Sequence, residues 1–227
     1  MVDETGDVPL QSPGVGPRGR FICLEGIEGV GKTTHLQAIV DHLNDRGIPA
    51  IRTREPGGTA LGEEVRGLLL SSDYPPMHPD TELLLMFAAR AEHLRHRILP
   101  ELEAGTWVVS DRFTDATYAY QGGGRGIQGS RIAVLEAWVQ GPWRPDLTLV
   151  LDASVETGLA RARRRSGGDR FEQESLAFFE RVRAVYHSRA HADPGRYALI
   201  PADGPLETVR RLVLERVDAL CAAVGNE

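Results

Sequence analysis

Short apolar runs alternate with longer amphipathic segments along this chain of 227 residues. Runs of a few residues rich in Val, Ile, Leu and aromatic side chains are typical of buried strands. They predict five strands, at residues 20–26, 48–55, 106–111, 147–152 and 196–203. Apolar residues at helical spacing predict helices at residues 32–44, 61–72, 79–105 (one helix or two), 131–140, 154–165, 174–193 and 206–225.

The alternation of strands and helices predicts an α/β fold, with a five-stranded, mostly parallel sheet covered by helices on both faces. In such sheets, ligands bind outside the carboxyl ends of the strands. The three glycines at 122–124 are expected to mark a loop. Residues 1–19 are acidic and rich in Pro and Gly, so we expect a flexible extension there and a single domain at 20–222.

Composition narrows the possible functions. A net charge of −6 argues against a general nucleic-acid binder, which usually carries a basic face. No apolar run approaches the ~20 residues that cross a bilayer, and we expect no membrane segment. Cys23 and Cys221 both lie in apolar runs, which indicates free thiols in the cytoplasm. Lys32 is the only lysine beside 25 arginines, which suggests a position that needs an ammonium group.

The segment from Gly26 to Thr33, GIEGVGKT, has the spacing of a phosphate-binding loop. Its glycines let backbone N–H groups face a phosphate, and the following helix adds a partial positive charge. The alternative is a glycine-rich turn without chemical meaning. The strand before the loop, the helix after it and the single lysine favour nucleotide binding.

Charged residues also follow two other predicted strands. Asp111 and Arg112 end the third strand, where an acid often holds Mg²⁺ or its water in a nucleotide-binding fold. Arg54 and Glu55 end the second strand, immediately before a Pro-Gly-Gly turn. The alternatives are a strand-capping carboxylate and an ordinary surface turn.

An arginine cluster occupies residues 161–165 and is followed by two glycines and Arg170. A charge run on a helix is usually a solvated face. Four arginines within five residues repel one another unless an anion is near, however, so we favour a lid at about residues 161–172 that closes over a triphosphate.

Several further residues have a structural and a functional interpretation. Phe87 and Arg90 share one side of a predicted helix, where a phenylalanine is usually core. Tyr120 and Gln121 are equally compatible with packing. His93 and His96 show no metal-ligand spacing and are expected on a helix surface.

Together, the segments EGIEGVGKTT, TREPGGT, MFAAR, DRF, TYAYQGGGRG, RPDLTLVLD and the arginine lid closely resemble those of bacterial thymidylate kinases. The resemblance covers residues 20 to 222. It implies a three-layer P-loop kinase fold with a short arginine-rich lid. It also implies transfer of the γ-phosphoryl group of ATP to dTMP, with Mg²⁺, in a homodimer formed through helices such as 81–99 and 131–140.

The resemblance also implies roles for matching residues. An ATP site would be formed by Gly26, Ile27, Glu28, Gly29, Val30, Gly31, Lys32, Thr33, Thr34 and Arg161. A dTMP site would be formed by Arg54, Glu55, Arg66, Phe87, Arg90, Arg112, Thr117, Tyr120 and Gln121. Metal binding would involve Thr33, Asp111 and Glu55, and catalysis would involve Lys32, Arg165, Glu28, Asp111 and Arg112.

Within that scheme, Phe87 would stack on thymine, Arg90 would donate to the base O4, and Tyr120 would crowd a ribose 2′-OH. Arg54, Arg66 and Arg112 would hold the acceptor phosphate. The phosphate loop carries an acid, Glu28, and the chain therefore matches the type of thymidylate kinase whose catalytic arginine comes from the lid. Arg165 is the best candidate for that arginine.

Three other functions remain open at this point. One is a nucleoside monophosphate kinase with another acceptor, such as dUMP or a modified pyrimidine. A second is a P-loop switch or motor that transfers phosphate to water, which leaves the arginine lid unexplained. A third is an inactive nucleotide sensor. Dependence of turnover on a monophosphate acceptor would separate them.

Overall fold

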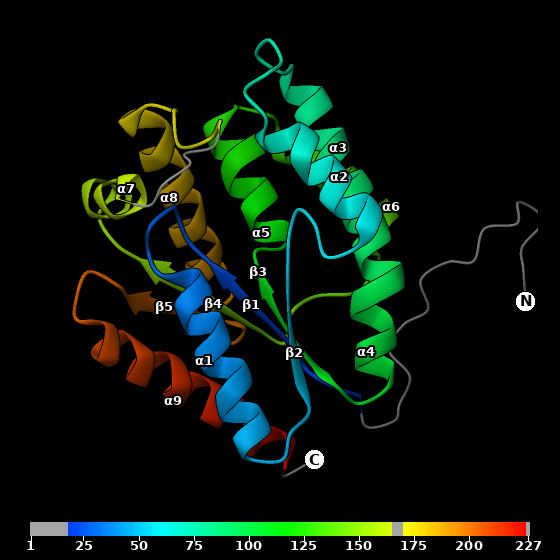
Figure 1. Cartoon of the computed structure of the whole chain (residues 1–227), viewed down its shortest axis with the longest axis vertical. Coiled ribbons are helices and arrows are strands. Elements are labelled where there is room, and N and C mark those ends of the chain that lie inside the picture. The colour runs from blue at the N-terminus through cyan, green and yellow to red at the C-terminus, as the bar shows by residue number, and fades with distance from the viewer. Residues whose placement is uncertain (1–17, 165–169, 226–227) are drawn as a thin grey trace, which may run out of the picture.

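The computed structural model describes residues 18–164 and 170–225. Five parallel strands form the sheet of this described part, in the order β2-β3-β1-β4-β5 (Figure 1). The strands are β1 (Phe21–Glu25), β2 (Ala50–Arg54), β3 (Trp107–Asp111), β4 (Leu147–Asp152) and β5 (Tyr197–Pro201). The predicted α/β fold is confirmed, and every strand pair is parallel.

The two faces of the sheet follow from the alternation of side chains along β1. Ile22 and Leu24 pack in the cluster that contains residues of α1 (Lys32–Asp45) and α9 (Leu206–Val224). Phe21 and Cys23 pack instead with residues of η1 (Leu94–Ile98), a π-helix, and α4 (Leu99–Glu103). Because both faces are covered, β1 is apolar throughout until Glu25.

The other predicted helices also form. They are α2 (Ala60–Leu70), α3 (Pro79–His93), α6 (Gly129–Gln140), α7 (Val155–Arg163) and α8 (Leu176–Ala192). The long segment predicted as one helix or two is a continuous helical run, in which α3 passes through η1 directly into α4. None of the helices in the described residues has the length and apolar composition to cross a membrane.

The prediction of a loop at residues 122–124 is wrong. Residues 114–124 are helical, as α5 (Thr114–Thr117) and the π-helix η2 (Tyr118–Gly124). A Cβ atom on Gly124 would lie 2.4 Å from the Phe178 ring, and one on Gly123 would lie 2.7 Å from Val185 Cγ2. These glycines therefore allow η2 to approach α8 closely, and that packing outweighs their poor helix propensity.

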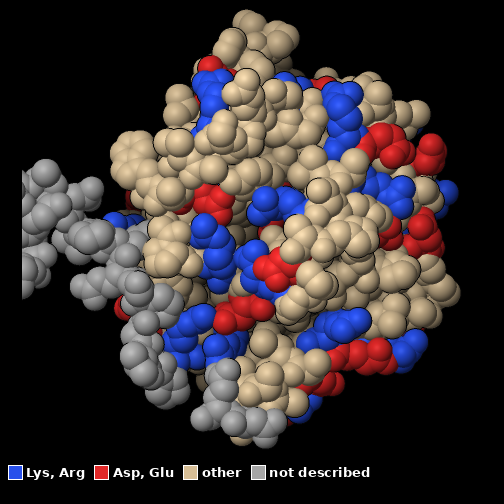
Figure 2. All heavy atoms as spheres, turned by 180° about the vertical axis from the view of Figure 1, so that it is seen from behind, with Lys and Arg blue, Asp and Glu red and all other residues tan. Residues whose placement is uncertain are grey.

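Strand register gathers the polar strand ends at one edge of the sheet. Asp111 pairs with Arg54 on one side and with Leu24 on the other, so β2 and β3 end beside the segment that follows β1. On the face seen in Figure 2, basic and acidic side chains lie beside one another in the centre, on the right and in the lower part of the view. Positive charge on that face is therefore local.

Candidate functional site

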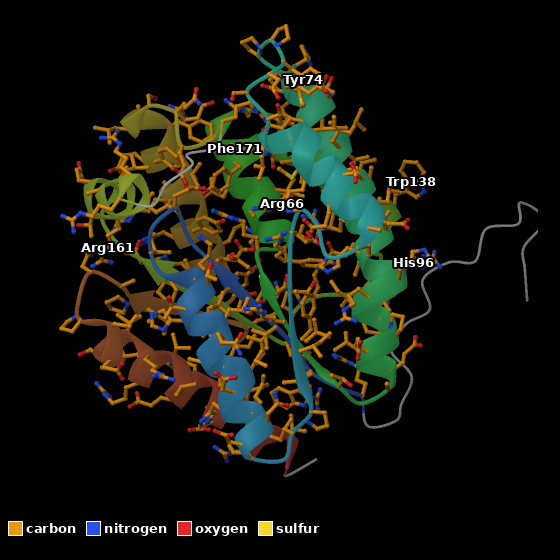
Figure 3. All side chains as sticks on the ribbon, viewed as in Figure 1. Arg66, Tyr74, His96, Trp138, Arg161 and Phe171 are labelled. Carbon is orange, nitrogen blue, oxygen red and sulfur yellow. The ribbon has the colours of Figure 1, made fainter. Side chains whose placement is uncertain are left out.

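A cavity of ≈ 390 Å³ lies at the carboxyl edge of the sheet. Segments after β1, β2 and β3 line it together with α2, α3, α5 and η2. Arg66 of α2 and Phe171, beyond α7, lie above the strand ends in the view of Figure 3. Its lining includes Glu28, Gly29, Gly31, Lys32, Thr33, Arg54, Glu55, Arg66, Met86, Arg90, Asp111, Arg112, Thr117, Tyr120, Gln121, Phe171 and Glu172.

The glycine-rich loop between β1 and α1 forms one end of this cavity. Gly29 has φ +75°, and a Cβ atom there would lie 1.9 Å from Gly158 O. Lys32 Nζ donates to Gly26 O at 2.9 Å and to Ile27 O at 2.8 Å, so the ammonium group lies over the loop. Burial, reinforced by Arg112, lowers the pKa of Lys32 to about 8.

The loop residues divide into two groups. Glu28, Gly29, Gly31, Lys32 and Thr33 line the cavity, as a phosphate-binding loop requires. Four other residues predicted for the ATP site are not among its lining, namely Gly26, Ile27, Val30 and Thr34. Ile27 and Val30 are buried in the core, so their side chains anchor the loop while only their backbones are available to a ligand.

Arg112 is held rigidly beside this loop. Its Nη2 donates to Glu28 Oε1 and to Tyr120 Oη, both at 2.9 Å, and its Nη1 donates to Tyr186 Oη at 3.1 Å. Burial would lower the pKa of Arg112, but the facing hydroxyl and carboxylate groups outweigh it and raise the pKa. Glu28, an acid in a phosphate-binding loop, therefore has a clear structural partner in Arg112.

The backbone of Arg112 has φ +71°, a left-handed conformation that costs a non-glycine residue about 1–3 kcal/mol. Its N–H donates to Leu24 O at 2.9 Å, and its carbonyl accepts from Ser110 Oγ at 2.7 Å. These hydrogen bonds retain the strained turn, which aims the guanidinium at the loop.

Glu25 is a buried acid behind Arg112 that sequence reasoning missed. Its carboxylate accepts from Phe113 N and Tyr186 Oη, each at 2.8 Å. Burial, with a contribution from the negative charge of Asp115, raises the pKa of Glu25 to about 7. The signal was an acid at the end of an otherwise apolar strand, immediately before the glycine-rich loop.

Asp111 and Thr33 carry the oxygen atoms best suited to a metal. Asp111 Oδ1 is buried and has no hydrogen-bond partner among the described residues. Within the same residues, no group of three or more His, Cys, Asp or Glu could hold a metal ion by itself. One carboxylate and one hydroxyl beside a phosphate site fit Mg²⁺, which is commonly held by one or two carboxylates together with substrate phosphates.

Arg54, Arg66 and Arg112 all line the cavity, as predicted for an acceptor-phosphate site. Arg66 donates to Pro56 O at 3.0 Å, and Arg54 pairs with Glu63 at 2.7 Å. Burial lowers the pKa of Arg66, and repulsion from Arg54 and Arg112 lowers it further, with Glu63 and Asp111 opposing. A bound anion would relieve this repulsion.

Arg90 lines the same cavity and belongs to a buried network. Its Nε donates to Glu55 Oε2 at 2.7 Å and its Nη2 donates to Thr117 Oγ1 at 2.9 Å. Arg90 Nη1 is buried and has no hydrogen-bond partner among the described residues. Arg90 lines the cavity, and Nη1 is the donor that its protein partners leave unused.

Glu55 has both carboxylate oxygens occupied, since Oε1 lies 3.1 Å from Nδ1 of His93. Burial raises the pKa of this group, but Arg90 and His93 outweigh it and hold the pKa below its usual value. These contacts hold the Glu55 carboxylate against Arg90 and His93, and its expected role in metal binding stays a prediction. His93 is fully buried and lies 2.5 Å from Thr53 Oγ1, so its expected position on a helix surface is wrong.

The expected stacking of Phe87 on a base requires correction. Phe87 is 2% exposed, packs with Leu83, Ile127 and Ile132, and lies under the Arg90 guanidinium at 4.8 Å. Its neighbour Met86 lines the cavity instead. Successive helical residues point about 100° apart, so a shift of one position moves a side chain out of the site.

Tyr120 and Gln121 line the cavity from η2. Tyr120 Oη donates to the Glu28 carboxylate at 2.7 Å, which links this end of the site to the glycine-rich loop. Gln121 Nε2 donates to the buried Glu82 of α3 at 2.8 Å. Thr117 is 1% exposed, and its hydroxyl accepts from Arg90.

The arginine-rich segment is described in part. Arg161 donates to the carbonyls of Ala202 at 2.8 Å and Asp203 at 3.0 Å, in the turn after β5 (Figure 3). Arg170 Nη2 donates to Glu82 Oε2 at 2.7 Å. Phe171 and Glu172 line the cavity, so the segment reaches the site. Arg165, the predicted catalytic arginine, lies outside the described residues.

Comparisons with known proteins agree with this geometry. A family model described as thymidylate kinase matches residues 24–213. The thymidylate kinase of Alkalilimnicola ehrlichii is 58% identical over 208 residues, covering 91% of this chain and 94% of the relative. That of Methylococcus capsulatus is 55% identical over 204 residues, covering 90% and 97%. The crystal structure of thymidylate kinase from Ehrlichia chaffeensis superposes with a TM-score of 0.73 at 33% identity, covering 89% of this chain and 99% of that one.

Proposed function

This chain belongs to the thymidylate kinase family, and from that membership and the site geometry we propose how its residues perform the reaction. The enzyme phosphorylates dTMP to dTDP. One observation carries the proposal: a single cavity is lined by Lys32 and the glycine-rich loop and also by Arg90, whose Nη1 has no hydrogen-bond partner among the described residues.

The donor is ATP, with its β- and γ-phosphates over the loop. Lys32 and the loop N–H groups neutralise phosphate charge, while residues 26–34 shape the turn. Thr33 and Asp111 would hold Mg²⁺, whose chemistry here is charge neutralisation on the triphosphate. We propose Arg161 of α7, which donates to the turn after β5, as an ATP contact.

The acceptor phosphate lies among Arg54, Arg66 and Arg112. An oxygen of that phosphate forms a bond to the γ-phosphorus while the bond from this phosphorus to the β–γ bridging oxygen breaks, leaving ADP. Phosphoryl transfer depends on positioning and charge stabilisation. Glu28 contributes by fixing Arg112 in place through the 2.9 Å ion pair.

The base lies at the far end. Arg90 Nη1 donates to the thymine O4, and Gln121 and Thr117 line the base edge. Met86 takes the position beside the base that the sequence had suggested for Phe87. Tyr120, held by Glu28, crowds the place of a 2′-hydroxyl.

The arginine-bearing segment supplies further positive charge. Arg165 is proposed as the residue that reaches the transferring phosphoryl group, with Arg170 anchoring the segment against α3. An arginine delivered by a closing segment stabilises the transition state and excludes water as a competing acceptor.

A homodimer is proposed through α3 and α6, which contact each other. Leu84 of α3 is 57% exposed, and Val134 and Trp138 of α6 are 68% and 75% exposed. Trp138 points away from the body of the molecule (Figure 3). Such a group of large exposed apolar residues is typical of a protein contact. A cytoplasmic location is proposed from the free thiols of Cys23 and Cys221.

Steady-state ADP formation from Mg-ATP tests the proposal, with dTMP, dUMP, ribo-TMP, CMP, AMP and no acceptor compared. We expect ADP release with dTMP, matched by dTDP formation. ADP release that is equal with and without an acceptor would show transfer to water and contradict the proposal.

A further inference from the structure

A second buried acid lies behind the base end of the cavity. Glu82 is fully buried in α3 and is not part of the cavity lining. Its Oε1 accepts from Gln121 Nε2 at 2.8 Å, and its Oε2 accepts from Arg170 Nη2 at 2.7 Å. Arg125 Nε lies 3.3 Å from Oε1. The Glu82 carboxylate pairs with Arg125 at 3.3 Å and with Arg170 at 2.7 Å, and a carboxylate in such pairs accepts hydrogen bonds.

This contact decides which way the Gln121 amide faces. Because Glu82 has no hydrogen to offer, the amide must present its Nε2 to Glu82. Glu82 lies away from the cavity while Gln121 lines it. The other amide atom of Gln121, its Oε1, then faces the cavity, and it has no hydrogen-bond partner among the described residues. Gln121 is therefore fixed as an acceptor for a ligand.

Arg90 supplies the complementary donor, since its buried Nη1 has no hydrogen-bond partner among the described residues. A donor and an acceptor from two residues that line one cavity match thymine, whose O4 accepts and whose N3–H donates. Cytosine has the opposite pattern, with an amino group at C4 and an unprotonated N3. We propose that Glu82 is a specificity-determining residue, which selects an imide base by fixing the polarity of Gln121. This inference rests on the proposed orientation of dTMP.

Arg170 also binds Glu82, so a change at Glu82 alters the arginine-bearing segment as well. That effect acts on the phosphoryl transfer and changes turnover of every acceptor alike. The ratio of kcat/KM between two acceptors cancels this common effect. The matched acceptors are dTMP and 5-methyl-dCMP, which share the methyl group, the sugar and the phosphate and differ in the hydrogen-bonding edge.

The experiment measures kcat/KM for both acceptors in the wild type, Glu82→Gln and the control Glu174→Gln. Glu174 pairs with Arg125, the same arginine that pairs with Glu82, while the Gln121 amide donates to Glu82. We expect the wild type to prefer dTMP by more than about 10³-fold, because a site built for one hydrogen-bond pattern rejects its opposite strongly. A glutamine at position 82 both donates and accepts, so Gln121 can turn, and the preference should narrow at least about tenfold. Glu174→Gln should leave the ratio unchanged.

A second measurement needs no variant and decides the matter if Glu82→Gln does not fold. The wild type should not use 3-methyl-dTMP, which lacks the N3–H group. An unchanged ratio in folded Glu82→Gln, or turnover of 3-methyl-dTMP equal to that of dTMP, overturns the inference while the kinase activity stands. Failure to phosphorylate dTMP itself would contradict the function as well.

Discussion

Replacing Glu55 with Gln tests the buried network that holds Arg90. The side chains of Glu55 and Arg90 are 5% and 2% exposed, and their ion pair measures 2.7 Å. Removing one partner of a buried pair costs about 3–5 kcal/mol, because the other charge is left uncompensated. An amide keeps one acceptor for Arg90 Nε, so we expect the lower end, about 3 kcal/mol.

For a domain of this size, ~3 kcal/mol lowers Tm by roughly 6–12 °C. The same change frees Arg90 from its fixed orientation, so KM for dTMP should rise about tenfold or more while KM for ATP stays constant. Thermal unfolding and steady-state kinetics measure the two effects. The control is Glu63→Gln, which removes the Arg54–Glu63 pair, whose side chains are 53% and 40% exposed. Surface pairs are worth about 0–1 kcal/mol, and its Tm should barely move. A Glu55→Gln protein with the Tm and dTMP KM of the wild type would refute the reasoning.

Three other predictions concern separate parts of the molecule. The pKa of Lys32 is about 8 and only the charged form of its side chain attracts phosphate, so kcat/KM for ATP should fall as the pH rises through about 8. A pH profile of kcat/KM that stays flat to about pH 10 would contradict this prediction. Gly124→Ala should lower the unfolding free energy by about 1–3 kcal/mol, because the added Cβ meets the Phe178 ring. The control Gly67→Ala has open space around the added Cβ and should be neutral or stabilising. Equal Tm shifts for the two variants would show that η2 and α8 are not closely packed. Trp138→Glu should convert a dimer to a monomer in sedimentation, and an unchanged mass would place the contact elsewhere.

Sequence reasoning found the strands and the phosphate-binding loop because both depend on residues close together in the chain. The five strands formed where the apolar runs predicted them, and Arg54 and Asp111 ended adjacent strands. The glycine-rich loop combined a strand, a turn and a helix within a few residues. Local pattern and tertiary fold agree in these segments.

The remaining features depend on packing between distant segments. Glu25 meets Tyr186 across 161 residues, and Glu82 meets Gln121 across 39. A single sequence contains no sign of such pairs, so the partners of these acids were not predictable. The choice between Met86 and Phe87 required the rotation of α3 about its axis, which is not determined by an apolar run of LLLMF.

The single lysine has a chemical consequence beyond phosphate binding. Acylating reagents attack an amine in its neutral form, and with a pKa of about 8 roughly half of Lys32 is neutral at pH 8. The chain offers such reagents one ε-amine, and it lies at the donor end of the cavity. Amine-directed labelling of the lysine therefore reports on the nucleotide site alone, and a bound nucleotide should protect it. For the same reason, any modification confined to lysine side chains would have to act on this catalytic position.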